Sequence, residues 1–200
     1  MKKSKSKLIR TVLFSATLAS VFMFASCNQN RNTQDSKDIA EDNNEAMFSK
    51  EKENDAEFLV SAAEINLEEI ELGKLAQKNS SMPDVIALGK MMEEEHSKAL
   101  IDLQMLAKNK QITVPNIITD KGKDAYNKLK VLSGEAFDYE YCDMMVKGHE
   151  DAISKFEEGL SETKDTDIKT WANEMIISLR LHLSKSISCK EKCAKMKTKS

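Results

Sequence analysis

Apolar residues recur along most of the chain at alternating spacings of four and three, which is the period of an amphipathic helix. The first stripe consists of Phe58, Ala62, Ile65, Leu72 and Ala76. Comparable stripes follow further along the chain, whereas no run alternates β-branched and aromatic residues in the manner of a strand. We therefore predict an all-α fold with four long helices, over residues 55–79, 83–110, 134–162 and 165–193.

The breaks between these stripes indicate how the helices are connected. Pro83 and Asp84 suit the first turn of a helix, so we expect a short turn before them. A longer segment separates the second and third stripes, and we predict a short helix there, near residues 124–132. Four long amphipathic helices with one long connection predict a four-helix bundle with a crossover between its second and third helices.

The two ends of the chain differ from its middle. Residues 1–26 hold a basic start, a short apolar run and small residues before Cys27, as in a removable signal peptide. "FASC" resembles a bacterial lipoprotein box, in which Cys27 would carry the lipid, although an ordinary secretory signal containing a cysteine is the alternative. We expect residues 27–54 to form a flexible tether, because they are polar and poor in aromatic residues, and residues 194–200 to form a basic tail.

The net charge of the chain indicates which classes of partner it can bind. The chain has 30 basic and 33 acidic residues, and the first 26 residues hold five of the basic ones and no acidic one. Removing them leaves 25 basic against 33 acidic residues, a net charge of −8. An acidic chain without a basic patch argues against nucleic acid as a partner, so we expect contact with a membrane through the lipid anchor only. A homo-oligomer remains open, and no protein partner is indicated.

Four polar residues interrupt the apolar stripes. The three histidines of the chain, His96, His149 and His182, fall on the stripes of the second, third and fourth helices, and Glu69 falls on that of the first. Each lies 13 to 17 positions from the predicted start of its helix, so a rise of about 1.5 Å per residue puts all four in one central layer. Three imidazoles and a carboxylate form a ligand set that Fe, Zn or Cu could use.

Further candidates lie near this layer. Glu93, Glu95, Asp138 and Tyr141 could each contribute, and Glu93 with His96 forms a Glu-x-x-His spacing on one helix face. Asp138 lies about three turns from His149, which favours a position outside the plane of the histidines. The alternative for the whole layer is a metal-free polar network that fixes how the helices align.

The sulfur-containing residues give weaker indications. Met91–Met92 and Met144–Met145 could hold copper beside imidazole, although methionine at helical spacing usually fills a core. Cys189 and Cys193 are four residues apart and could form a disulfide, a thiolate pair or neither. Cys142 stands alone in the sequence.

Four stretches together resemble the exported, ferritin-like proteins of domain-of-unknown-function family 4142, over about residues 55–188. They are "FLVSAAEINLEEIELGKLAQ", "MMEEEHSKAL", "GEAFDYEYCDMMVKGHEDAISKFEEG" and "WANEMIISLRLHL". The pattern comprises Glu69, the acidic-His pair Glu95-His96, Phe137, Asp138, Tyr141, His149 and His182. The resemblance implies a ferritin-like bundle in the bacterial periplasm or at its membranes, and no established activity.

The chain departs from that family and from its distant relatives in specific ways. The family usually has Asp where this chain has Glu95, and a proline before the last histidine, which is missing here. Di-iron proteins repeat Glu-x-x-His on two helices, whereas Val146 and Leu179 stand three before His149 and His182. A standard di-iron centre is therefore not expected.

Three functions remain open on the sequence. The leading one is an envelope-anchored, periplasm-facing bundle that binds a metal or small ligand through its central layer. The second is a structural or interaction protein of the cell envelope, and the third is a histidine-rich metal oxidoreductase. No phosphate loop, nucleophile elbow or His-Glu-x-x-His motif is present, so we favour a non-enzymatic role.

Overall fold

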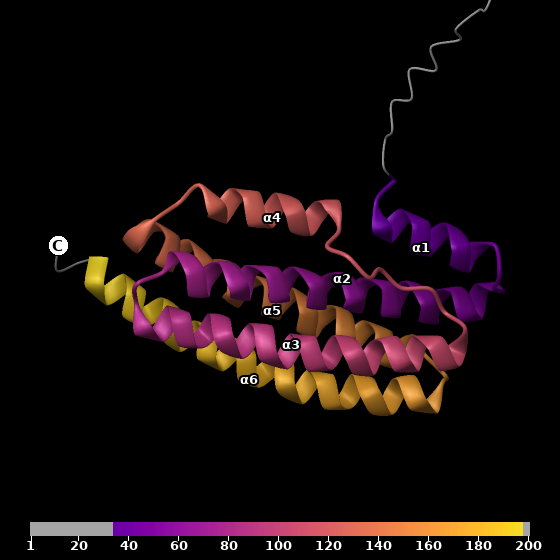
Figure 1. Ribbon diagram of the computed structural model, residues 1–200. Helices are drawn as coiled ribbons and strands as arrows, with labels where there is room; N and C mark the ends of the chain where they lie inside the picture. Colours follow the sequence, from indigo (N-terminus) through magenta and orange to yellow (C-terminus); the bar gives the residue numbers. More distant parts are fainter. Residues whose placement is uncertain (1–33, 198–200) are drawn as a thin grey trace, which may run out of the picture. The chain divides into compact units, whose positions relative to one another are not determined.

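The computed structural model describes residues 34–197, which form six α-helices (Figure 1). These are α1 (Ser36–Glu45), α2 (Lys50–Asn79), α3 (Pro83–Lys110), α4 (Asp120–Lys130), α5 (Gly134–Glu162) and α6 (Thr166–Lys197). No strand occurs among these described residues, so the predicted all-α class is confirmed. Within the same part of the chain, no helix combines the length and the apolar character that a membrane span requires.

The four long helices pack as two antiparallel pairs. α2 packs along α3, and α5 packs along α6, while α2 also contacts α5 and α3 contacts α6. The connection between α3 and α5 runs back along the length of the helices, and α4 lies within it, against α2 (Figure 1). This is the long crossover that the sequence predicts, with its helix beginning at Asp120 rather than near Asp124.

Local signals in the sequence account for several helix ends. Pro83 opens α3 with Asp84 in the first turn, and α3 ends where Gln111 adopts a left-handed conformation, with φ 61°. The Thr119 side chain accepts a hydrogen bond from the Gly122 amide at 3.3 Å and so caps α4. Asp165 caps α6 in the same way, accepting from the amide of Ile168 at 3.2 Å.

Two expectations about the ends of the folded part were wrong. Residues 36–45 and 50–54, expected within a flexible tether, form α1 and the beginning of α2. Contacts over long sequence distance contribute to this order: the Asn44 side chain accepts from the Thr113 amide and donates to the Thr113 carbonyl, both at 2.8 Å. Residues 194–197 belong to α6 rather than to a tail, since the buried Cys193 holds this last turn against the helices. Cys27 and the predicted signal peptide lie outside the described residues.

The buried apolar residues form two separate clusters along the helices. One is centred on Phe58, Phe156 and Trp171, and the other on Leu72, Phe137 and Met145. On every long helix, a buried polar residue stands between the parts belonging to the two clusters: Glu69 on α2, His96 on α3, His149 on α5 and His182 on α6. A polar layer therefore divides the core at mid-length.

The backbones of α2 and α3 come close together at two glycines. A Cβ atom on Gly73 would lie 2.6 Å from the Gly89 carbonyl oxygen, and one on Gly89 would lie 2.7 Å from the Gly73 carbonyl oxygen. Neither position leaves room for a side chain, so the glycines set the distance between these two helices.

Candidate metal centre

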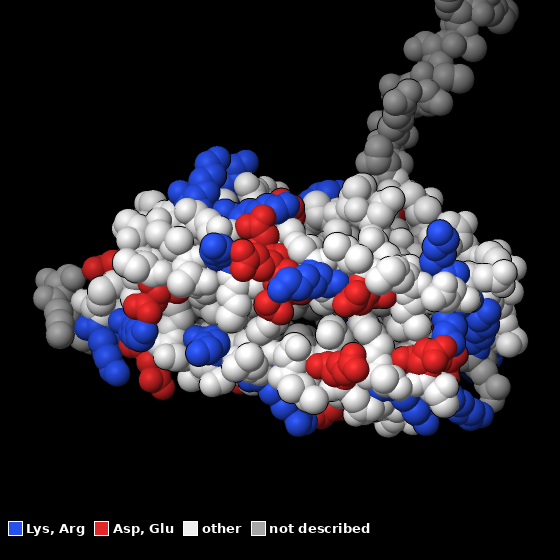
Figure 2. All heavy atoms as spheres, turned by 60° about the horizontal axis from the view of Figure 1, so that its bottom comes forward, with Lys and Arg blue, Asp and Glu red and all other residues white. Residues whose placement is uncertain are grey.

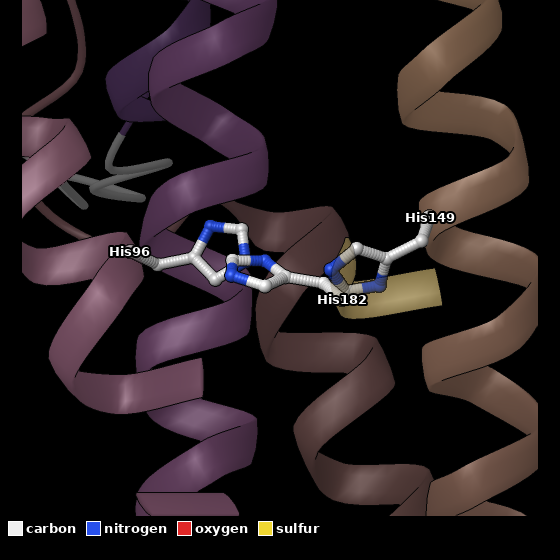
Figure 3. Close-up of side chains that lie close together, drawn as sticks. All are labelled: His96, His149 and His182. Atoms are coloured by element: carbon white, nitrogen blue, oxygen red, sulfur yellow. The ribbon is translucent and has the colours of Figure 1, made fainter. Parts of the chain in front are cut away.

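Three histidines from three helices face one another in the polar layer. His96 projects from α3, His149 from α5 and His182 from α6, with their rings directed toward a common point (Figure 3). Their ring centroids are 5.6 Å apart for His96 and His149, 5.1 Å for His96 and His182, and 5.4 Å for His149 and His182. One nitrogen of each ring lies within 4.8 Å of the others.

Hydrogen bonds to two of the rings fix which nitrogen carries the proton. His149 Nδ1 lies 2.7 Å from the Met145 carbonyl oxygen, which can only accept, so Nδ1 donates. The Asn66 amide donates through Nδ2 to the Ala62 carbonyl at 2.8 Å, which turns its Oδ1 toward His96 Nδ1 at 2.9 Å. His96 Nδ1 must then also be the donor. In both neutral rings, Nε2 therefore keeps a free lone pair.

Burial keeps all three rings uncharged near neutral pH. Loss of solvation, helped by the two neighbouring rings, holds the pKa of His96 well below its usual range. Burial also lowers the pKa of His149 to about 4, although its bond to Met145 opposes that change, and burial lowers the pKa of His182. Neutral imidazole is the form that binds a metal ion.

The lone pairs of this layer are not used elsewhere in the fold. His96 Nε2, His149 Nε2 and His182 Nδ1 are all buried, and no hydrogen-bond partner for them occurs in the described part of the chain. Buried polar atoms are hydrogen-bonded in the great majority of cases. Three converging rings, each with an uncommitted nitrogen, therefore point to a ligand rather than to a completed network.

Glu69 lies beside the histidines and not among the converging nitrogens. Its Oε1 is 3.9 Å from His149 Nδ1, which is too far for a hydrogen bond, and its buried Oε2 is among the atoms without a partner. Burial, together with the charge of Glu68, raises the pKa of Glu69 well above its usual range. Glu69 would thus reach a bound ion only after its side chain moves. In the present arrangement it lies near His149 Nδ1, the ring nitrogen that donates to Met145.

The two other predicted glutamates lie at the edge of the layer. Glu93 accepts a hydrogen bond from the Gln77 side chain at 2.6 Å, so it is paired with α2. Glu95 is exposed and pairs with Lys98 at 3.0 Å, although its charge still opposes the lowering of the His182 pKa. Neither carboxylate joins the three histidines.

Asp138 and Tyr141 are buried on the side of the layer that faces the second core cluster. Tyr141 is fully buried, and burial followed by the charge of Glu69 raises the pKa of its phenol well above 10. Asp138 is 4 % exposed and lies near Cys193, whose thiol has a pKa raised to about 11 chiefly by burial, with contributions from Cys189 and Asp138. Asp138 therefore lies away from the histidines, as its sequence separation predicted.

A cavity leads from the surface to two of the rings. It has a volume of about 190 Å³ and is lined on one side by His96, His182 and Asn66, with Glu95 and Lys98 among its exposed residues. On the face shown in Figure 2, acidic and basic side chains are interspersed rather than gathered into a field of one sign. An ion or a molecule of a few atoms could reach the histidines by this route.

Sequence reasoning missed two features of this region. Asn66 was overlooked although it lies three residues before Glu69 and hence on the same helix face. Cys142, which seemed isolated, lies with its Sγ 3.0 Å from that of Cys189. That proximity depends on how far α5 and α6 are shifted along each other. Helical periodicity predicts the buried face of each helix but not this shift.

Comparison with known proteins gives one match. The model of the family described as Domain of unknown function (DUF4142) matches residues 40–187, which span α2, α3, α4 and α5 and most of α6. No curated protein matches the chain. No solved structure matches it either.

Proposed function

The chain belongs to the DUF4142 family, and within that framework we propose that it binds a divalent transition-metal ion through His96, His149 and His182. The ion would sit in the layer that divides the core of a ferritin-like four-helix bundle. The observation that carries the proposal is the convergence of three buried, neutral rings, each with one buried nitrogen that has no partner in the described part of the chain.

The ligand set suits zinc and its neighbours in the first transition series. Three protein nitrogens with a fourth position left for water or another molecule is the arrangement of open zinc sites. Nitrogens bonded at about 2.1 Å to one tetrahedral ion lie about 3.4 Å apart, so small ring movements would bring the present set to bonding distance. The cavity beside His96 and His182 supplies space for the fourth ligand.

Contacts around the rings support the same function. A metal-bound histidine almost always donates its other nitrogen to a carbonyl or carboxylate group. Met145 and Asn66 already accept from Nδ1 of His149 and His96. Two of the three rings are thus held, without the ion, in the tautomer that an ion would require.

A metal-free structural layer fits these observations less well. Leaving a buried polar atom without a partner costs about 1–3 kcal/mol, and this layer holds several such atoms, from all three histidines and Glu69. A network that served only to align the helices would be expected to satisfy its own members. The three rings instead bring one nitrogen each to within 4.8 Å of the others.

The first prediction is that the full chain, purified without a histidine tag, binds one equivalent of Zn(II) or Co(II). Zn(II) at about 100 times its dissociation constant should raise the free energy of unfolding by about 2.7 kcal/mol, because the ion binds the folded state. The visible spectrum of Co(II) would report nitrogen ligands in a four- or five-coordinate site. His149→Gln should lose both effects.

Two further variants, one beside a histidine ring and one at an exposed position, test whether the effect is specific to the histidine layer. Asn66→Leu should weaken binding about 10- to 100-fold, as loss of the partner of a ligand does. Glu94→Gln, at an exposed position on α3 that pairs with Lys90, is the matched control and should bind as the parent does. Equal binding by parent and His149→Gln would refute the proposal, as would a parent that binds neither ion.

We also infer that the bundle is anchored to a bacterial membrane through Cys27 and faces the periplasm. The support is the sequence alone: a basic start, a short apolar run and small residues before the cysteine. Two or three acyl chains on one cysteine would anchor the protein stably.

Anchoring predicts a shift between cell fractions. Cys27→Ser, expressed in a bacterium that processes lipoproteins, should move the protein from the membrane fraction to the soluble periplasm, and labelled palmitate should no longer be incorporated. Cys142→Ser is the control, because it removes another thiol and should leave fractionation unchanged. A Cys27→Ser protein that still fractionates with membranes would contradict the assignment.

A further inference from the structure

Four sulfur atoms meet at the other end of the α5–α6 pair from its connecting turn. Cys142 lies on α5, Cys189 and Cys193 lie one turn apart on α6, and Met82 immediately precedes α3. Cys142 Sγ is 3.0 Å from Cys189 Sγ and 3.8 Å from Cys193 Sγ, and Cys193 Sγ is 3.6 Å from Met82 Sδ. All four residues are buried, and the three cysteines are present as free thiols.

We propose that Cys142, Cys189, Cys193 and Met82 form a site for a soft monovalent metal ion, Cu(I), distinct from the histidine site. Thiolate donors suit Cu(I), zinc and iron–sulfur clusters, and the neutral, soft thioether of Met82 favours Cu(I) among these. Binding involves no electron transfer: each thiol that becomes a ligand releases its proton to solvent, and its sulfur lone pair forms the bond to copper.

The distances agree with this assignment. With metal–sulfur bonds of about 2.3 Å, the sulfurs around a tetrahedral ion lie about 3.8 Å apart. Of the three separations given above, those of 3.6 and 3.8 Å match this spacing, and the Cys142–Cys189 separation, at 3.0 Å, must widen.

The surrounding structure holds the fourth donor in place. Met82 is fixed in the turn between α2 and α3, where its amide donates to the Ser80 hydroxyl at 3.0 Å and its carbonyl accepts from Val85. Lys192 pairs with Asp84, which draws the end of α6 onto the beginning of α3. Cys193 is thereby kept beside Met82.

The site has a route to the surface and is separate from the histidines. A groove of about 330 Å³, lined by Asp84, Leu88, Cys189 and Lys192 among others, reaches Cys189. Cys142 and Cys189 each lie seven residues from a histidine of the same helix, which is about 10 Å along the axis. The two sites can therefore be emptied independently by substitution.

The test is a competition for Cu(I) with bicinchoninate, whose coloured complex reports copper that the protein has not taken. The reduced full chain, kept without oxygen, should remove one equivalent of Cu(I) and develop the ultraviolet absorption of a copper–thiolate bond. Cys189→Ser and Cys193→Ser should lose that equivalent. Met82→Leu should bind more weakly, since a neutral donor is lost while the thiolates remain.

Two controls separate this site from the one proposed above. His149→Gln should still take up Cu(I) by the thiolates if the sulfur site is real, whatever becomes of Zn(II) binding. Cys27→Ser removes the fourth cysteine of the chain, outside the described residues, and should also leave uptake unchanged. X-ray absorption of the copper-loaded parent should show sulfur as the nearest neighbours, and this readout does not depend on any variant folding.

Several outcomes would overturn the proposal. One is a reduced parent that leaves all the copper with bicinchoninate. Another is undiminished uptake by Cys189→Ser that folds with the helicity of the parent. A third is a copper shell made of nitrogen alone. A Cys142–Cys189 disulfide in the purified protein, with no copper uptake after its reduction, would show that the cluster serves covalent bonding instead.

Discussion

Replacement of Phe156 by alanine is expected to lower the free energy of unfolding by about 4 kcal/mol, the usual cost of truncating a buried aromatic residue. Phe156 is 3 % exposed, and its ring lies 5.2 Å from that of Phe58, edge to face, and 5.4 Å from that of Trp171. Truncation removes contacts with both rings and leaves a hole in the first core cluster. Urea unfolding followed by circular dichroism would measure the change.

The position of Phe156 adds a second consequence. Its side chain also lines the cavity beside His96 and His182, so the hole would join that cavity and admit water to the histidine layer. Ile177→Ala on α6 is the control, because Ile177 is 71 % exposed and should change the stability by less than about 0.5 kcal/mol. A loss for Phe156→Ala no larger than that of Ile177→Ala would show that the aromatic cluster is not packed as described.

Gly73→Ala is expected to destabilise the protein by about 3 kcal/mol, at the upper end of the cost of overpacking. The added Cβ would lie 2.6 Å from the Gly89 carbonyl oxygen and 2.9 Å from the Glu93 amide nitrogen. Both atoms belong to the backbone and cannot turn away as a side chain does. α2 and α3 must therefore separate, and denaturant unfolding would record the loss.

The same substitution should reach the histidine layer. Asn66 and His96 each lie seven residues from the glycine contact, on α2 and α3. Separating the helices would lengthen the 2.9 Å hydrogen bond between these residues, so Gly73→Ala should also weaken Zn(II) binding.

Gly148→Ala on α5 is the matched control for Gly73→Ala. Its Cβ would meet only a side-chain oxygen, Glu69 Oε1, at 3.2 Å, and alanine favours a helix over glycine by about 1 kcal/mol. We expect a change near zero or slightly stabilising. If both glycine variants behaved alike, helix propensity rather than close approach would explain the result.

Much of the fold follows from local properties of the sequence. α3 and α5 begin and end at the residues that their apolar stripes predicted, because Pro83 and the breaks at 111–119, 131–133 and 163–165 interrupt the helical period. The three histidines meet as expected, since residues at similar depth on one side of parallel or antiparallel helices must face one another.

Other features required contacts between distant parts of the chain. The polar composition of residues 36–54 suggested a tether, yet α1 is docked by contacts with distant residues, among them the Asn44 side chain paired with the backbone at Thr113. Position along the helix predicted that Glu69 lies in the same layer as the histidines. It could not show that Glu69 lies on the Nδ1 side of His149. The contact between Cys142 and Cys189 likewise depends on how the side chains of α5 and α6 are directed where these two helices pack.

The arrangement of the histidines among the helices has a consequence for assembly of the chain. His96 belongs to the α2–α3 hairpin, and His149 and His182 belong to the α5–α6 hairpin, while the connection around α4 joins the two. An ion bound by all three histidines would link the N-terminal α2–α3 hairpin to the C-terminal α5–α6 hairpin. Release of the ion would then be coupled to the two hairpins loosening from each other, and not to the opening of a single loop.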